Sequence, residues 1–321
     1  MPEPRFDVST LGEAMLRLSV RPGDRLLDAP AYQVHVAGSE ANVAYALAQV
    51  GARSAWTSVL PRNRLAERIA GTLRAGGVDL SGVVWTDSGR VGTYFVELAT
   101  EPRGPSVVYD RAGSAICAAT PDLFDWDLVC AARVVHVSGI TFGLSPGMLE
   151  VSRRAIAEAR RRGCRVSLDV NYRTLLWPPA AAAAALREQR GACDLVICTA
   201  EDARDVFGLQ GEPEDLARGL QSELECPAVA LTLGAEGAAL AEGGSVMRRS
   251  AFRVQAVDRI GTGDAFAAGL LWGWLEDSLP MGLDRGVAMA ALKMTVHGDL
   301  FTLGADDVHR LLEGEQRRVR R

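Results

Sequence analysis

The sequence predicts an α/β protein: a parallel β-sheet between two layers of helices, together with a smaller, separate β-sheet. From residue 133 onward, short apolar segments rich in β-branched residues alternate with segments of helical pattern, which is typical of a parallel sheet covered on both faces. Residues 14–36 alternate polar and apolar side chains, and residues 83–112 carry no helical pattern. With 321 residues, 48% of them hydrophobic, the chain can bury a large core.

The first quarter of the chain opens the α/β core. The pattern predicts a strand over residues 5–12, a helix that begins after residues 37–42 and runs to residue 50, a strand over residues 54–60 and a helix over residues 64–75. Gly51 is expected to end the first helix, because glycine accepts the left-handed conformation found there.

The smaller sheet comes from two separate parts of the sequence. Strands are predicted over residues 91–98 and 106–111, joined by a turn at residues 101–105, and the short strands of residues 14–36 complete the sheet. We call this sheet the lid. The predicted division is a lid of residues 14–36 and 91–113, and a core of residues 1–13, 37–90 and 114–321.

Beyond residue 133 strands and helices follow each other regularly. The pattern predicts strands over residues 134–138, 165–170, 195–199 and 228–233, helices over residues 147–162, 178–189, 200–207 and 213–224, a hairpin of residues 238–241 and 245–254, and helices after Gly263 and Asp284. Ligands of such sheets bind beyond the carboxyl ends of the strands. The candidates are therefore the polar residues that follow strands: Gly12 and Glu13, residues 169–173, Thr199 with Asp202, and residues 232–237.

Composition excludes several classes of protein. The net charge of −5 gives no attraction to nucleic acid or membrane surfaces, and the short basic stretch at residues 317–321 is expected to be solvated. No segment has the form of a signal peptide or the length of a membrane span, and the six scattered cysteines suggest free thiols. We therefore expect a cytoplasmic protein. The single lysine, Lys293, fits neither a P-loop nor a protein kinase, so phosphate chemistry would rest on backbone amides and arginines.

One stretch near the C-terminal end, residues 256–269, combines Gly261, Thr262, Gly263 and Asp264 with a long apolar helix. Glycines let successive amides converge, and the start of a helix attracts anions. A carboxylate would repel a bound anion, so Asp264 is better placed to accept a proton. The alternative is an ordinary helix start, with glycine in the turn and Asp264 in the first helical turn.

The other candidates each have a structural alternative. Thr199 and Asp202 could position Mg²⁺ through waters, or Thr199 could be the N-cap of the following helix. Thr232, Gly234 and Gly237 could let the backbone approach a nucleotide, or form an ordinary turn.

The arginines and tyrosines also allow two interpretations. Arg111 and Arg173 could bind carboxylate or phosphate, or be solvated. Tyr94 and Tyr109 could bind sugar hydroxyls, or pack within the lid.

Together these pieces resemble the ribokinase-like, phosphofructokinase-B family of sugar kinases over nearly the whole chain. That family's C-terminal signature, Asp-x-x-Gly-Ala-Gly-Asp-x-Phe, corresponds to residues 258–266, and its N-terminal glycine-rich signature ending in Asn-Val-Ala corresponds to residues 37–44. Within the family the chain is most similar to 2-keto-3-deoxygluconate kinases, on residues 109–115, 138–141, 169–177 and 292–299. Related fructokinases share part of the stretch at 171–177.

The resemblance implies an ATP- and Mg²⁺-dependent kinase, with a monovalent cation as an additional option. It implies that Asp264 is the base and that the amides of Gly261, Thr262 and Gly263 hold the transferring phosphoryl group. The implied substrate contacts are Gly38, Asn42, Tyr94, Tyr109, Arg111, Arg173 and Asp299. The implied nucleotide contacts are Asn171, Thr199, Thr232, Gly234 and Gly237, with Asp202 near the metal through water. A homodimer through the lid is expected on the same ground.

Three departures from the family pattern are visible, and rival functions stay open. One departure is that an Asn often found in the adenine-proximal helix is not evident around residues 287–291. The Asn-x-x-Glu metal motif reads Thr199-x-x-Asp202, and the usual alanine of the anion loop is Thr262. The rivals are a fructokinase or another neutral-sugar kinase, and a non-catalytic protein that binds sugar for regulation. A dinucleotide oxidoreductase fits worse, because the third glycine is missing and Asp264 would repel a pyrophosphate.

Overall fold

The computed structural model describes residues 3–98 and 103–314, and within them the chain forms two β-sheets. The larger sheet has nine strands in the order β13-β12-β11-β10-β9-β8-β1-β4-β5. Its strands are parallel except β12, which runs antiparallel to both neighbours. The strands are β1 (Phe6–Leu11), β4 (Ser54–Pro61), β5 (Val83–Thr86), β8 (Ala132–Ser138), β9 (Arg165–Asp169), β10 (Leu195–Thr199), β11 (Ala228–Thr232), β12 (Ala238–Glu242) and β13 (Ser245–Arg249).

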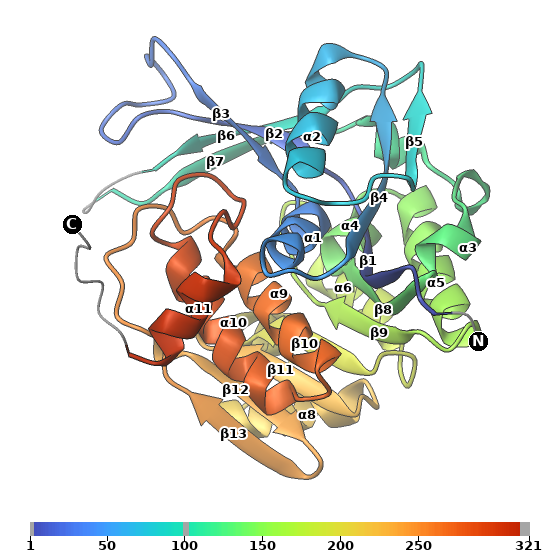
Figure 1. Ribbon diagram of the computed structural model, residues 1–321, viewed down its shortest axis with the longest axis vertical. Coiled ribbons are helices and arrows are strands. Elements are labelled where there is room, and N and C mark those ends of the chain that lie inside the picture. Colours follow the sequence, from blue (N-terminus) through green and yellow to red (C-terminus); the bar gives the residue numbers. More distant parts are fainter. Residues whose placement is uncertain (1–2, 99–102, 315–321) are drawn as a thin grey trace.

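Helices cover both faces of this sheet (Figure 1). One face packs against α3 (Trp126–Val129), α5 (Pro146–Arg161), α6 (Pro179–Arg187), α7 (Ala200–Asp205) and α8 (Pro213–Glu223). The other packs against α1 (Ser39–Gln49), α9 (Thr262–Leu275), α10 (Leu279–Lys293) and α11 (Ala305–Leu312), with α2 (Arg64–Ala75) beside α1. The short α4 (Gly139–Gly143) follows β8 directly. The predicted three-layer α/β fold is confirmed.

The small sheet has the order β3-β2-β6-β7, and Figure 1 shows it projecting from one end of the larger sheet. Its strands are β2 (Met15–Ser19), β3 (Gln33–Ala37), β6 (Gly92–Glu97) and β7 (Ser106–Asp110). It joins the two predicted sequence segments, as expected for the lid. Part of the turn expected at residues 101–105 and the basic stretch at 317–321 lie outside the described residues.

Several element boundaries differ from the sequence prediction. Helix α10 begins at Leu279, not after Asp284, because the Ser278 side chain caps the amide of Met281 and Pro280 suits the first turn. Strand β13 ends at Arg249. Strand β5 was not predicted, since its four half-buried residues carry no alternation. No helix among the described residues has the length and apolar character needed to cross a membrane.

The packing of helices on both faces of the sheet brings polar residues together at one edge of the sheet. Helix α9 is buried along most of its length, from Ala265 to Leu275, so the loop before it is held against the sheet. Because this loop, the start of α1 and the ends of β9, β10 and β11 line one cavity, the strand ends supply polar groups to a single site.

Candidate active site

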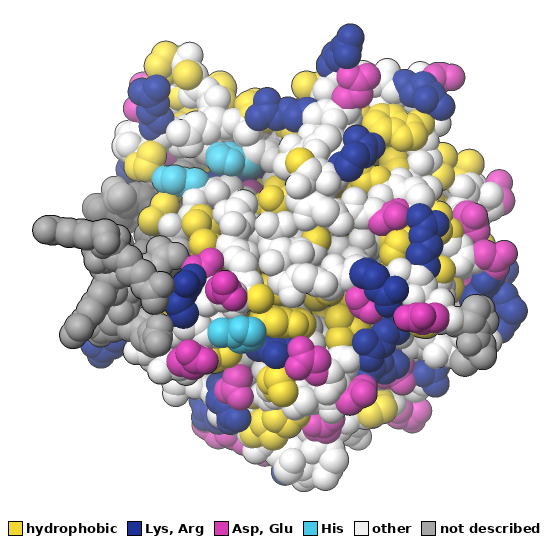
Figure 2. Space-filling model, in the orientation of Figure 1, with side chains coloured by type: hydrophobic (Ala, Val, Ile, Leu, Met, Phe, Trp, Pro, Cys, Tyr) yellow, Lys and Arg dark blue, Asp and Glu magenta, His cyan; other side chains and the backbone are white. Residues whose placement is uncertain are grey.

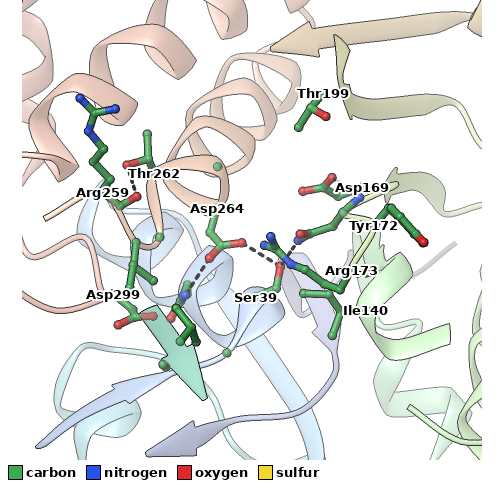
Figure 3. A pocket seen from close by; sticks show the side chains of 18 of the residues that line it. Ser39, Ile140, Asp169, Tyr172, Arg173, Thr199, Arg259, Thr262, Asp264 and Asp299 are labelled. Atoms are coloured by element: carbon green, nitrogen blue, oxygen red, sulfur yellow. Dashed lines mark hydrogen bonds between the residues drawn. The ribbon is translucent and has the colours of Figure 1, made fainter. Parts of the chain in front are cut away.

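A cavity of about 550 Å³ lies between the carboxyl ends of the parallel strands and the lid (Figure 3). Fifteen of the predicted site residues line it: Gly38, Asn42, Tyr94, Tyr109, Arg111, Asn171, Arg173, Thr199, Asp202, Thr232, Gly261, Thr262, Gly263, Asp264 and Asp299. Residues up to 261 positions apart in the sequence, Gly38 and Asp299, thus face one space. The face shown in Figure 2 carries interspersed acidic and basic side chains.

Two predicted residues, Gly234 and Gly237, do not line the cavity. Gly237 has φ of 110°, and a Cβ there would lie 1.9 Å from the carbonyl oxygen of Arg249, so the close approach of two strands explains this glycine. Thr232, at the end of β11, does face the cavity. The nucleotide contacts of the two glycines therefore stay a prediction.

The loop before α9 presents free backbone amides. Gly261 is the N-cap of α9 with φ of 84°, and a Cβ there would lie 2.2 Å from the carbonyl oxygen of Asp299. The amide of Thr262 donates to the carbonyl of Arg259 at 3.3 Å, whereas the amides of Gly261 and Gly263 have no acceptor among the described residues. Two free donors at a helix start are an arrangement that favours an anion.

Asp264 is held at this loop by two donors from α1. Ser39 Oγ donates to Asp264 Oδ1 at 2.7 Å (Figure 3). Asn42 Nδ2 donates to Asp264 Oδ2 at 2.7 Å. Asn171 Nδ2 donates in turn to Ser39 Oγ at 2.9 Å. Burial raises the pKa of Asp264, while Asn42, Ser39 and nearby Arg173 oppose that rise by stabilising the charged form. The two donors fix the orientation of the carboxylate, as a general base would require.

Ser39 was not identified from the sequence. Its signal was its position three residues before Asn42, which puts both side chains on one face of α1.

The cavity is rich in carboxyl groups. Six carboxyl side chains and three guanidinium groups line it, an excess of three formal negative charges. Burial raises the pKa of Asp169 well above its usual range, and the charges of Asp264 and Asp202 raise it further. Burial also raises the pKa of Asp202. Such a set of crowded carboxylates favours a bound cation.

No group of three or more His, Cys, Asp or Glu side chains in residues 3–98 and 103–314 is arranged to hold a metal ion. A cation here would need further oxygens from a bound ligand or water, as Mg²⁺ accepts. Asp169 and Asp202 are the carboxylates that fit it. Thr199 Oγ1 accepts from the amide of Asp202 at 2.8 Å, so the N-cap interpretation of Thr199 is confirmed, and Thr199 also faces the cavity.

The lid end of the cavity contains a buried network that the sequence did not reveal. Arg17, with no exposed surface, contacts Asp258 at 2.8 Å and Asp299 at 3.0 Å. Tyr94 donates to the other oxygen of Asp299 and stacks on Tyr109, with ring centroids 5.5 Å apart. The tyrosines therefore pack within the lid, as one of the two interpretations has it. They also face the cavity, and their contacts with sugar hydroxyls stay a prediction.

The three arginines of the cavity differ in their partners. Arg111 pairs with Glu13, and both are largely buried. Arg173 and Arg259 are exposed at the cavity and form no ion pair with the described residues. A negatively charged ligand would therefore meet its free positive charge at Arg173 and Arg259.

Comparison with known proteins identifies the family to which this chain belongs. Residues 5–304 match the model of the pfkB family of carbohydrate kinases. The chain belongs to this family. A 2-dehydro-3-deoxygalactonokinase of Haloferax volcanii is 37% identical over 96% of this chain and 97% of its own. A 2-dehydro-3-deoxygluconokinase of Thermoproteus tenax is 34% identical over 92% and 91%. The crystal structure of the 2-dehydro-3-deoxygluconokinase of Thermotoga maritima superposes with a TM-score of 0.91 at 32% identity, over 96% of this chain and 98% of that one.

The pfkB assignment confirms the family resemblance and makes the chain an ATP-binding sugar kinase. It also agrees with the geometry of the cavity, where two free backbone amides and a carboxylate held by two donors adjoin a polar pocket beside the lid. The relatives named above act on acids that differ in sugar configuration, so they leave the identity of the sugar open.

Proposed function

We propose that this kinase transfers the γ-phosphoryl group of ATP to the terminal hydroxyl of a 2-keto-3-deoxy sugar acid, in the gluconate or the galactonate form. The observation that carries the proposal is the pair formed by Asp264 and the free amides of Gly261 and Gly263. Phosphoryl transfer requires in-line positioning and donors for the oxygens of the transferring group, more than covalent chemistry.

In the proposed reaction Asp264 takes the proton of the terminal hydroxyl while that oxygen bonds to the γ-phosphorus. The bond from the γ-phosphorus to the β-phosphate oxygen breaks, and ADP leaves. The amides of Gly261 and Gly263 stabilise the charge on the transferring group. A general base at this position contributes about 10²–10⁴-fold to the rate. Closure of the lid would exclude water and so limit hydrolysis of ATP.

Mg²⁺ would neutralise charge on the phosphates when bound. Asp169 and Asp202 are the side chains that would hold it, directly or through water, and the crowding of carboxylates supports this role. We therefore expect that chelation of divalent cations abolishes turnover and that added Mg²⁺ restores it. A dependence on monovalent cations is a further prediction, to be tested with potassium-free buffers.

Arg173 supports an acidic substrate in preference to a neutral sugar. Its exposed guanidinium faces the cavity without an ion pair, whereas Arg111 is neutralised by Glu13. Charge-assisted pairing with a carboxylate would favour the acid. If Arg173 serves ATP instead, a neutral sugar would be the better substrate, and the protein would be a fructokinase-like enzyme.

The test of the proposal is ADP formation by the purified protein with Mg²⁺, ATP and one acceptor at a time. The acceptors are 2-keto-3-deoxygluconate, 2-keto-3-deoxygalactonate, fructose and ribose. We expect turnover with one or both keto acids and at least tenfold lower kcat/KM with fructose and ribose. Preference for a neutral sugar would refute the acid substrate, and sugar binding without turnover would favour the non-catalytic regulatory alternative.

We also propose that two copies pair through their lids. All five residues of the edge strand β7 are exposed, among them Val107, Val108 and Tyr109. An apolar edge strand that is open to solvent favours pairing with another chain. Light scattering at micromolar concentration should give twice the mass of the chain, and a Val108→Lys variant should give a monomer.

A further inference from the structure

Two buried acceptor atoms that face the cavity have no partner. Seven buried side-chain oxygens and nitrogens of the described residues find no hydrogen-bond partner, and the two that belong to side chains lining this cavity are Glu13 Oε1 and Asn42 Oδ1. Burying a polar atom without a partner is unfavourable by about 1–3 kcal/mol, so such atoms are rare in native proteins. Two in one ligand cavity indicate a ligand that supplies two donors.

The chemical identity of each acceptor is fixed by its neighbours. Asn42 Nδ2 donates to Asp264, which leaves the amide oxygen Oδ1 as the free atom. Glu13 is 4% exposed, and its Oε2 accepts from Arg111 Nε at 2.8 Å and from a second nitrogen of the same guanidinium. The oxygens of a carboxylate that pairs with a guanidinium are acceptors, so Oε1 offers a second acceptor. Hydroxyl groups are the donors that a sugar offers.

The proposed substrate has the matching number of hydroxyls. A six-carbon 2-keto-3-deoxy acid carries hydroxyls on C4, C5 and C6 and none on C2 or C3. The C6 hydroxyl is the one that reacts at Asp264. Because Asn42 is hydrogen-bonded to Asp264, its Oδ1 would lie nearest the C5 hydroxyl when the C6 hydroxyl is at Asp264. The acceptor that remains for the C4 hydroxyl would then be Glu13 Oε1.

The position of Glu13 agrees with this order. Glu13 follows β1 and is held from the lid side by Arg111, which follows β7, whereas Asn42 lies on α1 beside the reacting end. Oε1 also lies beside Gly92 of β6, where a Cβ would come within 2.8 Å of it. Two lid strands thus lead to the residues that surround this oxygen.

We propose that Glu13 is a substrate-binding residue whose Oε1 accepts a hydrogen bond from the C4 hydroxyl of the sugar. Arg111 is then the positioning residue that holds the Glu13 carboxylate in place. This inference rests on the proposed function. C4 is the carbon at which the gluconate and galactonate forms differ in configuration. The C4 hydroxyl of one epimer would therefore donate to Glu13 Oε1 in good hydrogen-bond geometry, whereas that of the other epimer would approach this oxygen at a different angle.

The experiment compares Glu13→Gln with the wild type on the better keto acid and on its 4-deoxy analogue. A hydrogen bond to a charged group corresponds to about a 10- to 100-fold effect. We expect Glu13→Gln to lower kcat/KM about 10-fold or more on the hydroxylated acid, mainly through KM, and by less than about 3-fold on the 4-deoxy acid. The ratio of kcat/KM between the two epimers should also move toward one.

A matched control is Glu97→Gln, which disrupts another Glu–Arg pair of the lid, 2.8 Å to Arg103, away from the cavity. This variant should keep the wild-type preference for the C4 hydroxyl. If Glu13→Gln does not fold, as judged by its melting temperature, Glu13→Asp keeps the charge and withdraws the oxygen by one methylene, with the same expected pattern.

Equal losses of kcat/KM on the hydroxylated and 4-deoxy acids would overturn the assignment of Glu13 while leaving the kinase activity intact. If the wild type turns over neither keto acid but phosphorylates another sugar, the proposed function fails first, and the Glu13 assignment fails with it.

Discussion

The buried charges behind the anion loop lead to a prediction about stability. Lys293, the single lysine, has no exposed surface, and its Nζ donates to the carbonyl of Asp258 at 3.5 Å and of Val296 at 3.4 Å. With Arg17 it forms a buried cluster of two cations and the two carboxylates of Asp258 and Asp299. Burial lowers the pKa of Lys293, and the two carboxylates oppose that change. The formal charges of the cluster balance.

Replacing Lys293 with methionine keeps the length of the side chain but leaves two buried carboxylates facing Arg17 alone. Lys293 forms no direct ion pair among the described residues, but its removal leaves one buried carboxylate of the cluster uncompensated, and an uncompensated buried charge destabilises a protein by about 3–5 kcal/mol. The entropy of unfolding is about 2.1 cal/mol/K per residue, or about 0.7 kcal/mol/K for the 321 residues of this chain. The expected fall in melting temperature is therefore about 4–7 °C.

Differential scanning calorimetry of Lys293→Met beside the wild type measures this fall. The control is Arg190→Met, which removes a cation from an exposed pair with Glu225. Because exposed pairs contribute little, the control should melt within about 1 °C of the wild type. A Lys293→Met protein that also melts within about 1 °C of the wild type would refute the claim that this ammonium is a required counter-charge.

Three further predictions concern the groups around the base. Ser39→Ala removes a donor that stabilises the charged form of Asp264; the acidic limb of the pH profile of kcat/KM should move to higher pH, and an unchanged limb would contradict the role of Ser39. Burial raises the pKa of Glu40 to about 8, so between pH 4.5 and 8 the folded state holds a proton that the unfolded state has released. The contribution of Glu40 to the free energy of unfolding is therefore full below about pH 4.5. It falls by about 1.4 kcal/mol per pH unit as the pH rises toward 8. Glu40→Gln should flatten that fall in urea titrations at pH 5, 6.5 and 8, whereas parallel curves for both proteins would argue against a buried neutral Glu40. Gly261→Ala would bring a Cβ to 2.2 Å from the Asp299 carbonyl, so we expect loss of activity and a lower melting temperature, and a variant with wild-type kcat would show that the loop can rearrange.

The parts of the site that the sequence predicted are those encoded locally. Asp264 and its glycines occur in one short stretch, and Asn42 lies in a glycine-rich segment whose spacing is visible without a structure. The central parallel strands of the larger sheet, though not its edge strand β5, were predicted because continuous apolar, β-branched runs mark buried parallel strands. The observed helix boundaries differ from the predicted ones where a single capping side chain sets the start of the helix, as Ser278 does for α10.

The parts that the sequence did not predict depend on contacts between distant residues. Arg17 appears as one charged residue between the apolar side chains of a strand, and its partner Asp299 is 282 positions away. The pairing of Glu13 with Arg111 spans 98 positions and joins the core to the lid. Only the folded chain shows that Arg111 is already neutralised by Glu13, which is why the proposed recognition of an acid rests on Arg173.

The measurement that tests the central claim most directly is the rate of ADP formation by Asp264→Asn with saturating ATP, Mg²⁺ and the preferred keto acid. Asparagine has nearly the same size and shape as aspartate, but its amide group cannot take the proton of the sugar hydroxyl. We expect kcat to fall by about 10²–10⁴-fold, with the melting temperature and the affinity for ATP retained. A folded Asp264→Asn protein that retains more than a tenth of the wild-type kcat would contradict the assignment of Asp264 as the base.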